Sequence, residues 1–277
     1  MTSELCIFTL GQGARRMLVT DRLIEAPNWT PDGAALLVNG DGRLWRVPLA
    51  DPALTAVDTG HLSRLNNDHG IAPDGSRIMV SDKTDTGESC IYVLPAGGGT
   101  PRRVTEAVPS YWHGWSPDGR TIAYVGRRDG RYDIFTRDLP DGAERRLTSG
   151  FEHCDGPDYS ADGAWIWFNG QRDGRMQIWR IPAGGGTPER MTDDDRVNWF
   201  PHPSPDGRHV LYVSYAPGVR DHPRDHEVEL RLLPASGGAP RRLLAIFGGQ
   251  GSINVPCWSP DGGSFAFVRY ARDDGTF

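Results

Sequence analysis

The sequence predicts an all-β fold, a six-bladed β-propeller with four antiparallel strands in each blade, and three observations lead to this prediction. The first is a turn motif, most often Ser-Pro-Asp-Gly, that occurs six times in the 277 residues. Its aspartates are Asp32, Asp74, Asp118, Asp162, Asp206 and Asp261. The steps between them are 42, 44, 44, 44 and 55 residues, and a period in the forties indicates repeated all-β units of blade size.

The second observation is a set of short apolar runs that follow each turn. In the third unit they are 121–125, 133–136 and 146–148. The first run after each turn is 35–38, 77–80, 121–125, 165–168, 209–213 or 265–268. Short alternating runs bounded by Gly, Pro and Asp are typical of antiparallel strands. With the segment before the turn, each unit has four strands, A to D, and the turn joins A to B.

The third observation concerns the two ends of the chain. The last unit supplies strands A and B only, whereas the N-terminus carries two unassigned apolar runs, 5–10 and 16–20, on either side of a Gly-Gln-Gly turn. We therefore predict that these N-terminal outer strands pair with the C-terminal inner strands, which removes exposed sheet edges. The prediction is one propeller domain, 1–277, with its last blade shared between 1–22 and 251–277.

The repeats, for example Trp115-Ser116-Pro117-Asp118-Gly119 and Trp258-Ser259-Pro260-Asp261-Gly262, resemble the TolB-like propeller repeat over essentially the whole chain. The chain is also similar in kind to propeller oligogalacturonate lyases, which have similar turn repeats, one blade more and a histidine-rich metal site. Propellers serve as binding modules, hydrolases and lyases, so the resemblance implies the fold and leaves the function open.

Composition narrows the classes of partner and the compartment. The net charge of −6 and the lack of a long Lys/Arg run argue against a nucleic-acid partner, and no stretch has the length of a membrane span. The N-terminal residues 1–4 lack the features of a signal peptide, so we expect a cytoplasmic protein. The four cysteines, Cys6, Cys90, Cys154 and Cys257, have no close pairing and are expected to be free thiols. No nucleotide cofactor is expected, because the glycine-rich stretch 247–252 follows no strand–helix pattern.

Counting back from each turn aspartate locates the candidate site. Residues just before strand A are expected at the face opposite the A–B turns, which we call the top face. Seven residues before the aspartates stand Glu25, Asn67, Tyr111, Asp155, Trp199 and Asn254. Five residues before them, four units carry proline, whereas units two and three carry His69 and His113. We predict that His69, His113, Tyr111 and Asp155 are catalytic.

Further polar residues near this face complete the predicted site. The predicted substrate-binding residues are Asn67, Asp68, Asn198, Gln250, Asn254, Arg128, Arg172 and His222. His222 lies in the long B–C connection 216–227, which we expect to fold over the site. His153 and His202 are the predicted ligands of a divalent metal, Mn, Zn or Ca.

These residue types suit proton transfer. A histidine can abstract a proton beside a carboxylate or carbonyl, and arginines can bind a carboxylate through two hydrogen bonds. The sequence therefore predicts a lyase or isomerase that acts on an acidic or keto sugar. The alternative is a non-catalytic propeller that binds a protein partner or a ligand on the same face, which Trp112, Trp199 and Phe200 would favour. For any single histidine, a structural hydrogen-bonding role is the simpler interpretation.

Overall fold

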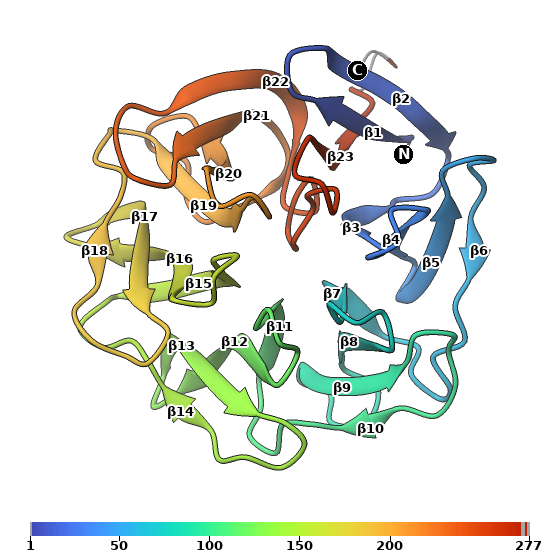
Figure 1. The fold of residues 1–277 in the computed structure, drawn as a ribbon, viewed down its shortest axis with the longest axis horizontal. Coiled ribbons are helices and arrows are strands. Elements are labelled where there is room, and N and C mark those ends of the chain that lie inside the picture. Colours follow the sequence, from blue (N-terminus) through green and yellow to red (C-terminus); the bar gives the residue numbers. More distant parts are fainter. Residues whose placement is uncertain (1, 273–274, 276–277) are drawn as a thin grey trace. The chain divides into compact units, whose positions relative to one another are not determined.

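The computed structural model describes residues 2–272 and 275, and these residues form 23 β-strands in six sheets and no helix (Figure 1). They divide into two compact units, one of residues 1–112 with 250–277 and one of residues 113–249. Each unit contains three sheets. The predicted six-bladed β-propeller with antiparallel blades is confirmed as the fold class, whereas the extent of one domain over 1–277 stays a prediction.

The first unit holds the sheets nearest the two ends of the chain. Its strands are β3 (Glu25–Trp29), β4 (Ala35–Gly40), β5 (Arg43–Pro48) and β6 (Thr55–Ala56); β7 (Leu65–Ile71), β8 (Arg77–Asp82), β9 (Cys90–Pro95) and β10 (Arg102–Arg103); and β1 (Ser3–Thr9), β2 (Gly13–Thr20) and β23 (Ser264–Tyr270). In the four-stranded sheets, strands that are consecutive in sequence are neighbours in the sheet.

The second unit holds the three middle sheets, built on the same plan. Their strands are β11 (Ser110–Trp115), β12 (Thr121–Arg128), β13 (Arg131–Asp138) and β14 (Arg145–Arg146); β15 (His153–Tyr159), β16 (Trp165–Arg172), β17 (Arg175–Pro182) and β18 (Glu189–Arg190); and β19 (Val197–Pro203), β20 (His209–Tyr215), β21 (Arg224–Pro234) and β22 (Arg241–Gly249). The connection before β21 is residues 216–223, shorter than predicted, because β21 starts early and pairs Arg224 with Gly249.

The N-terminal strands close the last sheet as predicted. β1 is the central strand of the order β2-β1-β23, and Figure 1 shows β1 in blue beside β23 in red. The register runs from the pair Ser3–Tyr270 to the pair Thr9–Ser264. The fourth strand of this sheet is reduced to a bridge between Trp258 and Phe265. Of the predicted share 1–22 and 251–277, residues 1, 273, 274, 276 and 277 lie outside the described residues.

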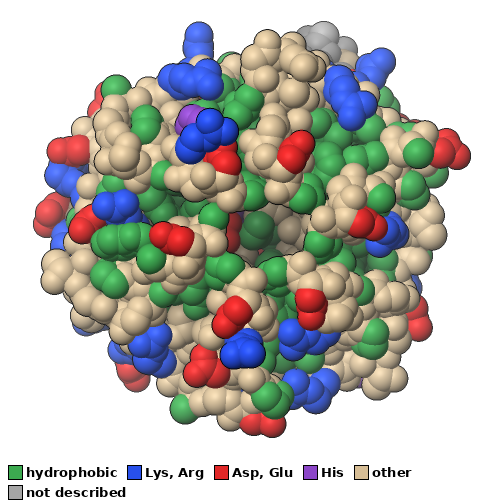
Figure 2. Space-filling model, in the orientation of Figure 1, with side chains coloured by type: hydrophobic (Ala, Val, Ile, Leu, Met, Phe, Trp, Pro, Cys, Tyr) green, Lys and Arg blue, Asp and Glu red, His purple; other side chains and the backbone are tan. Residues whose placement is uncertain are grey.

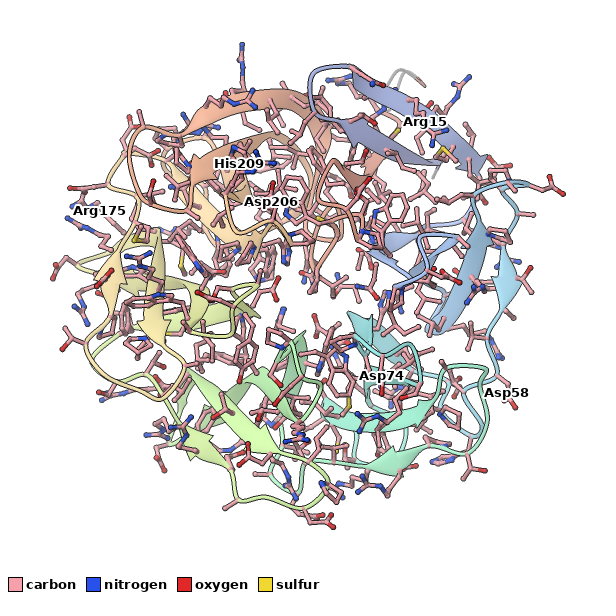
Figure 3. All side chains as sticks on the ribbon, viewed as in Figure 1. Arg15, Asp58, Asp74, Arg175, Asp206 and His209 are labelled. Carbon is pink, nitrogen blue, oxygen red and sulfur yellow. The ribbon has the colours of Figure 1, made fainter. Side chains whose placement is uncertain are left out.

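The repeated turn is held by its own side chains. In five copies the serine or threonine two residues before the aspartate donates a hydroxyl hydrogen bond to it, at 2.5–2.6 Å. The second copy has Ala72 at this position, and Ser76 donates to Asp74 instead, at 2.7 Å. Each glycine of the motif has a positive φ, as the turn requires. Asp74 and Asp206, labelled in Figure 3, are therefore scaffold residues.

Apolar side chains of neighbouring sheets pack together within each unit. In the first unit Leu37 and Leu44 pack with Ile78 and Tyr92. In the second unit Trp167 and Ile178 pack with Val210, Tyr212 and Leu233. The strand after each turn is largely buried, and β4 is buried at every residue. On the outside, Figure 2 shows acidic and basic side chains interspersed on the face in view, as on a solvated surface.

Candidate functional site

A β-bulge interrupts strand A just before the turn in several sheets. The register shifts between Glu25 and Asn28 in β3, between Asp155 and Asp158 in β15, and between Trp199 and His202 in β19. The residue six before the turn aspartate then has a positive φ: Ala26 (57°), Gly156 (58°) and Phe200 (53°). A bulge redirects the side chains beside it and is common next to functional sites. Here the redirected residues include the predicted Asp155.

Asp155 lies among three histidines of the second unit. The Nε2 atom of His113 in β11 is 3.2 Å from its Oδ1 atom. The Nε2 atoms of His153, at the start of β15, and of His222, in the 216–223 loop, are each 3.8 Å from its Oδ2 atom. The side chain of Asp155 is 15% exposed and that of His113 only 3%. Four predicted site residues thus form one cluster, which we call the Asp155 cluster.

Aromatic rings fix the imidazoles of the Asp155 cluster. His153 stacks on Tyr132 with ring centroids 4.9 Å apart, and His113 stacks on Phe200 at 6.0 Å. The edge-on contact of His222 with Trp199 is closer, at 4.3 Å. Rings packed in this way keep catalytic groups in one geometry.

Burial and charge set the protonation of this cluster. Burial alone would raise the pKa of Asp155, but the imidazoles of His113 and His153 outweigh it and hold that pKa well below its usual range. Burial lowers the pKa of His222, and the nearby Asp155 carboxylate only partly opposes this effect. At neutral pH the cluster therefore contains an ionised carboxylate beside a neutral imidazole, which can accept a proton.

A second group of predicted residues meets in the first unit. The side-chain amide of Asn254 donates to Asp68 at 2.6 Å and to Asn67 at 3.3 Å, and all three residues are buried. A cavity of about 380 Å³ beside them is lined by Glu25, Asn67 and Gln250, among others. Amides and carboxylates dominate this group, so it can bind hydroxyl or amine groups, and no histidine is among the described residues that line the cavity.

His69 lies fully buried in β7 of the first unit, and burial lowers its pKa to about 4 from 6.5. The unfolded chain binds a proton at this histidine at a higher pH than the folded protein does. The folded protein therefore has its full stability above the unfolded-state pKa and loses stability as the pH falls toward the folded-state pKa. We expect the free energy of unfolding to drop by about 3 kcal/mol through this residue between pH 6.5 and pH 4. Urea unfolding at a series of pH values measures the drop.

The variant His69→Asn should flatten the pH dependence over this interval. The control His61→Asn changes a histidine whose side chain is 54% exposed and should keep the wild-type slope. Equal slopes for the two variants would contradict the assignment to His69.

The remaining predicted residues have structural partners. Arg128 forms two hydrogen bonds with Glu144, at 2.6 and 3.0 Å. Arg172 lies over the rings of Phe151 and Trp179. The other partners are Ser214 for Asn198 (2.7 Å) and Asp158 for His202 (3.1 Å), while Tyr111 is half-buried in β11. Both arginines are thus engaged by other side chains.

The predicted metal ligands have separate carboxylate partners, Asp155 for His153 and Asp158 for His202. Among residues 2–272 and 275, no three His, Cys, Asp or Glu side chains form a group that could hold a metal ion. His153 and His202 thus do not share a carboxylate, and the divalent metal stays a prediction. The same residues contain no helix able to span a membrane.

Sequence reasoning missed a cavity of about 450 Å³ in the second unit. Its lining includes Arg175, Arg196 and Arg220, together with Trp199 of the ring packing described above. Arg220 belongs to the long connection that the sequence analysis singled out through His222, and Arg196 stands two residues before Asn198. The unusual length of that connection was the sequence feature that could have pointed to this cavity.

Comparisons with known proteins identify the family. The family model described as the TolB beta propeller domain matches residues 112–231. An uncharacterized protein of Agrobacterium fabrum is 52% identical over 98% of this chain and 93% of its own length. The chain belongs to the TolB-like β-propeller family. The resemblance predicted from the repeats is confirmed.

Several solved structures share the fold. A protein assigned as TolB from Agrobacterium tumefaciens matches with a TM-score of 0.97 and 51% identity, over 98% of this chain and 99% of that one. TolB from Acinetobacter baumannii matches with a TM-score of 0.72 and 18% identity, over 90% and 64%. An oligogalacturonate lyase in complex with manganese matches with a TM-score of 0.56 and 14% identity, over 89% and 74%. The last two likenesses concern the TolB-like fold alone.

Proposed function

We propose that this TolB-like propeller is a cytoplasmic lyase or isomerase that acts on an acidic or keto sugar by proton transfer at the Asp155 cluster. One observation carries the proposal: three imidazoles surround a single, nearly buried carboxylate. Perturbed titratable groups gathered in this way are typical of acid–base sites. The free, buried state of all four cysteines supports a reducing compartment.

The exposure of each side chain assigns its role. His222 is neutral and 21% exposed, and because its Nδ1 atom is buried, its Nε2 atom serves as the base that takes the proton from the carbon beside the carboxylate or carbonyl of the sugar. Asp155 stays ionised and stabilises the imidazolium that forms. His113, 3% exposed, does not meet the substrate and holds the carboxylate in place.

Removal of the proton leaves an electron pair on the carbon, and the bond that this pair forms determines the product. In an elimination, the pair forms a C=C bond, the C–O bond at the next carbon breaks, and the leaving oxygen takes a proton from His153, which is 25% exposed. In an isomerisation, the pair forms the C=C bond of an enediolate while the carbonyl oxygen takes the negative charge. A proton then moves from the neighbouring hydroxyl to that oxygen, and the abstracted proton returns to the former carbonyl carbon as the new carbonyl forms. Both sequences are written with residues of the chain alone.

Asp155→Asn is expected to lower kcat by about a hundredfold, because the neutral amide no longer stabilises the imidazolium, and general acid–base catalysis contributes at least this factor. Activity is measured on uronic acids and keto sugars. The two readouts are the ultraviolet absorbance of a new C=C bond and the exchange of the carbon-bound proton in D₂O, followed by NMR.

Asp85→Asn is the matched control, because Asp85 is an exposed carboxylate paired with His61 at 3.1 Å in the first unit. This variant should keep wild-type kcat. The proposal is wrong if no sugar of the panel is turned over or exchanged by folded protein, or if Asp155→Asn is as active as the control.

The alternative, docking of a protein partner through exposed aromatics, is less well supported. Trp112, Trp199 and Phe200 are at most 1% exposed, so they are not available as interface anchors. Among residues 2–272 and 275, the exposed large apolar side chain is Val19. A binding face for proteins usually presents a larger apolar patch.

A further inference from the structure

The cavity of about 450 Å³ in the second unit adjoins the Asp155 cluster without being part of it. Its walls come from the turn at Gly174 and Arg175 (Arg175 is labelled in Figure 3), from residues 195–197 and from loop residues 218–221. Trp199 lines the cavity and also contacts His222 of the cluster. The volume lies in the range of about 300–1,000 Å³ that small-molecule sites occupy.

Two guanidinium groups in this cavity are suited to an anion. Arg196 is held by Ser214, with Nε donating to Oγ at 2.8 Å and Nη2 to the backbone oxygen at 3.1 Å, and its Nη2 atom lies 3.7 Å from the Glu229 carboxylate. A guanidinium fixed in this way loses little entropy when its remaining N–H groups bind a ligand. Arg220 is exposed and has no hydrogen-bond or ion-pair partner among the described residues. Arg175 contributes less charge, because it pairs with Asp193 at 2.9 Å.

Two carboxylates stand beside these arginines. Asp195 and Asp221 both line the cavity and are exposed. Carboxylates accept hydrogen bonds from hydroxyl groups, whereas a guanidinium donates a pair of hydrogen bonds to a carboxylate. This mixed lining matches a ligand that carries one carboxylate and several hydroxyls, which is the chemistry of a sugar acid.

We propose that the cavity is the substrate-carboxylate subsite, in which Arg196 and Arg220 bind the carboxylate and Asp195 and Asp221 accept hydrogen bonds from hydroxyls. The inference rests on the proposed function and narrows its substrate class to sugar acids. The inference gives Arg196 and Arg220 the substrate-binding role that the sequence analysis predicted for Arg128 and Arg172. Asp221 lines the cavity, and the next residue, the base His222, contacts Trp199 of the cavity wall, so the two sites adjoin.

Isothermal titration calorimetry on the full chain tests the subsite with D-galacturonate and D-galactose, two sugars that differ by the carboxylate. Galacturonate is expected to bind at least tenfold more tightly. Arg220→Gln should weaken galacturonate binding about tenfold and leave galactose binding unchanged. Its side chain is exposed, so the variant is expected to fold.

Arg208→Gln removes the same charge in the same unit, from a side chain that is 76% exposed beside Asp206. This control should bind galacturonate like the wild type. The subsite is overturned if Arg220→Gln and Arg208→Gln bind galacturonate equally, if galactose binds as tightly as galacturonate, or if galacturonate does not bind.

The same variants separate this inference from the proposed function. Binding of galacturonate that depends on Arg220, with no turnover or proton exchange, supports the subsite and defeats the enzyme proposal. Turnover of a sugar acid with the same KM in Arg220→Gln and wild type defeats the subsite and leaves the enzyme proposal standing. A KM raised about tenfold with kcat unchanged supports both.

Discussion

Removal of residues 2–20 is expected to leave the chain unfolded in buffer. The deletion takes away β1 and β2, and β1 is the central strand of its sheet, paired with β23 at seven positions from Ser3–Tyr270 to Thr9–Ser264. It also removes Leu5 and Ile7 from the core, where they are at most 1% exposed. Native proteins are stable by only about 5–15 kcal/mol, which the loss of a central strand exceeds. Circular dichroism during heating and urea unfolding measure the outcome.

A circular permutant is the matched control for this deletion. It begins at residue 22 and carries residues 2–20 behind a short linker at the C-terminal end, where Tyr270 and Ser3 are already paired. The permutant has the same strands in a different order and should unfold cooperatively near the wild-type midpoint. A deletion variant that melts like the full chain would refute the closure of the last sheet by β1.

Arg269→Met is expected to destabilise the protein by about 1.5–3 kcal/mol, the range for hydrogen bonds to a charged group, because Arg269 is 32% exposed. The partner is Glu4, whose side chain is 1% exposed in β1. Arg269, in β23, donates to it through Nε at 2.6 Å and Nη2 at 2.5 Å, so the variant leaves a buried carboxylate with fewer partners. Urea unfolding at pH 7 measures the change in the free energy of unfolding.

Two further variants separate charge burial from packing. Arg16→Met removes the other arginine on Glu4, which is 62% exposed, and should cost less than about 1 kcal/mol. The double variant Glu4→Leu/Arg269→Met removes the buried charge itself and should recover much of the lost stability. If Arg269→Met costs no more than Arg16→Met, the buried pair does not stabilise the closing sheet.

The fold was predictable because its signals are local. The hydroxyl–aspartate turn, as at Ser116 and Asp118, is formed by residues two apart, so six copies of it were readable without any tertiary knowledge. The reduced inner strand at Trp258 was not predictable, because it depends on pairing with Phe265 across the turn rather than on composition.

The site was predictable only in part, because side-chain direction depends on packing. The position of Asp155 relative to the turn identified it, and the structure brings His113, His153 and His222 around it. The same counting selected His69, which is buried out of reach. The sequence analysis also selected Arg128, although Glu144 holds Arg128 through hydrogen bonds that no spacing rule reveals.

The closing sheet also has a consequence for biosynthesis. The first strand of the chain pairs with the last, and the contact between Thr9 and Ser264 spans 255 residues. At a translation rate of about 5–20 residues per second, β1 spends about 10–50 s on the ribosome before its partner exists. During that interval one edge of β1 is unsatisfied and open to pairing with other chains. The nascent protein is therefore exposed to aggregation for the whole length of its synthesis, at the strand that later completes its fold.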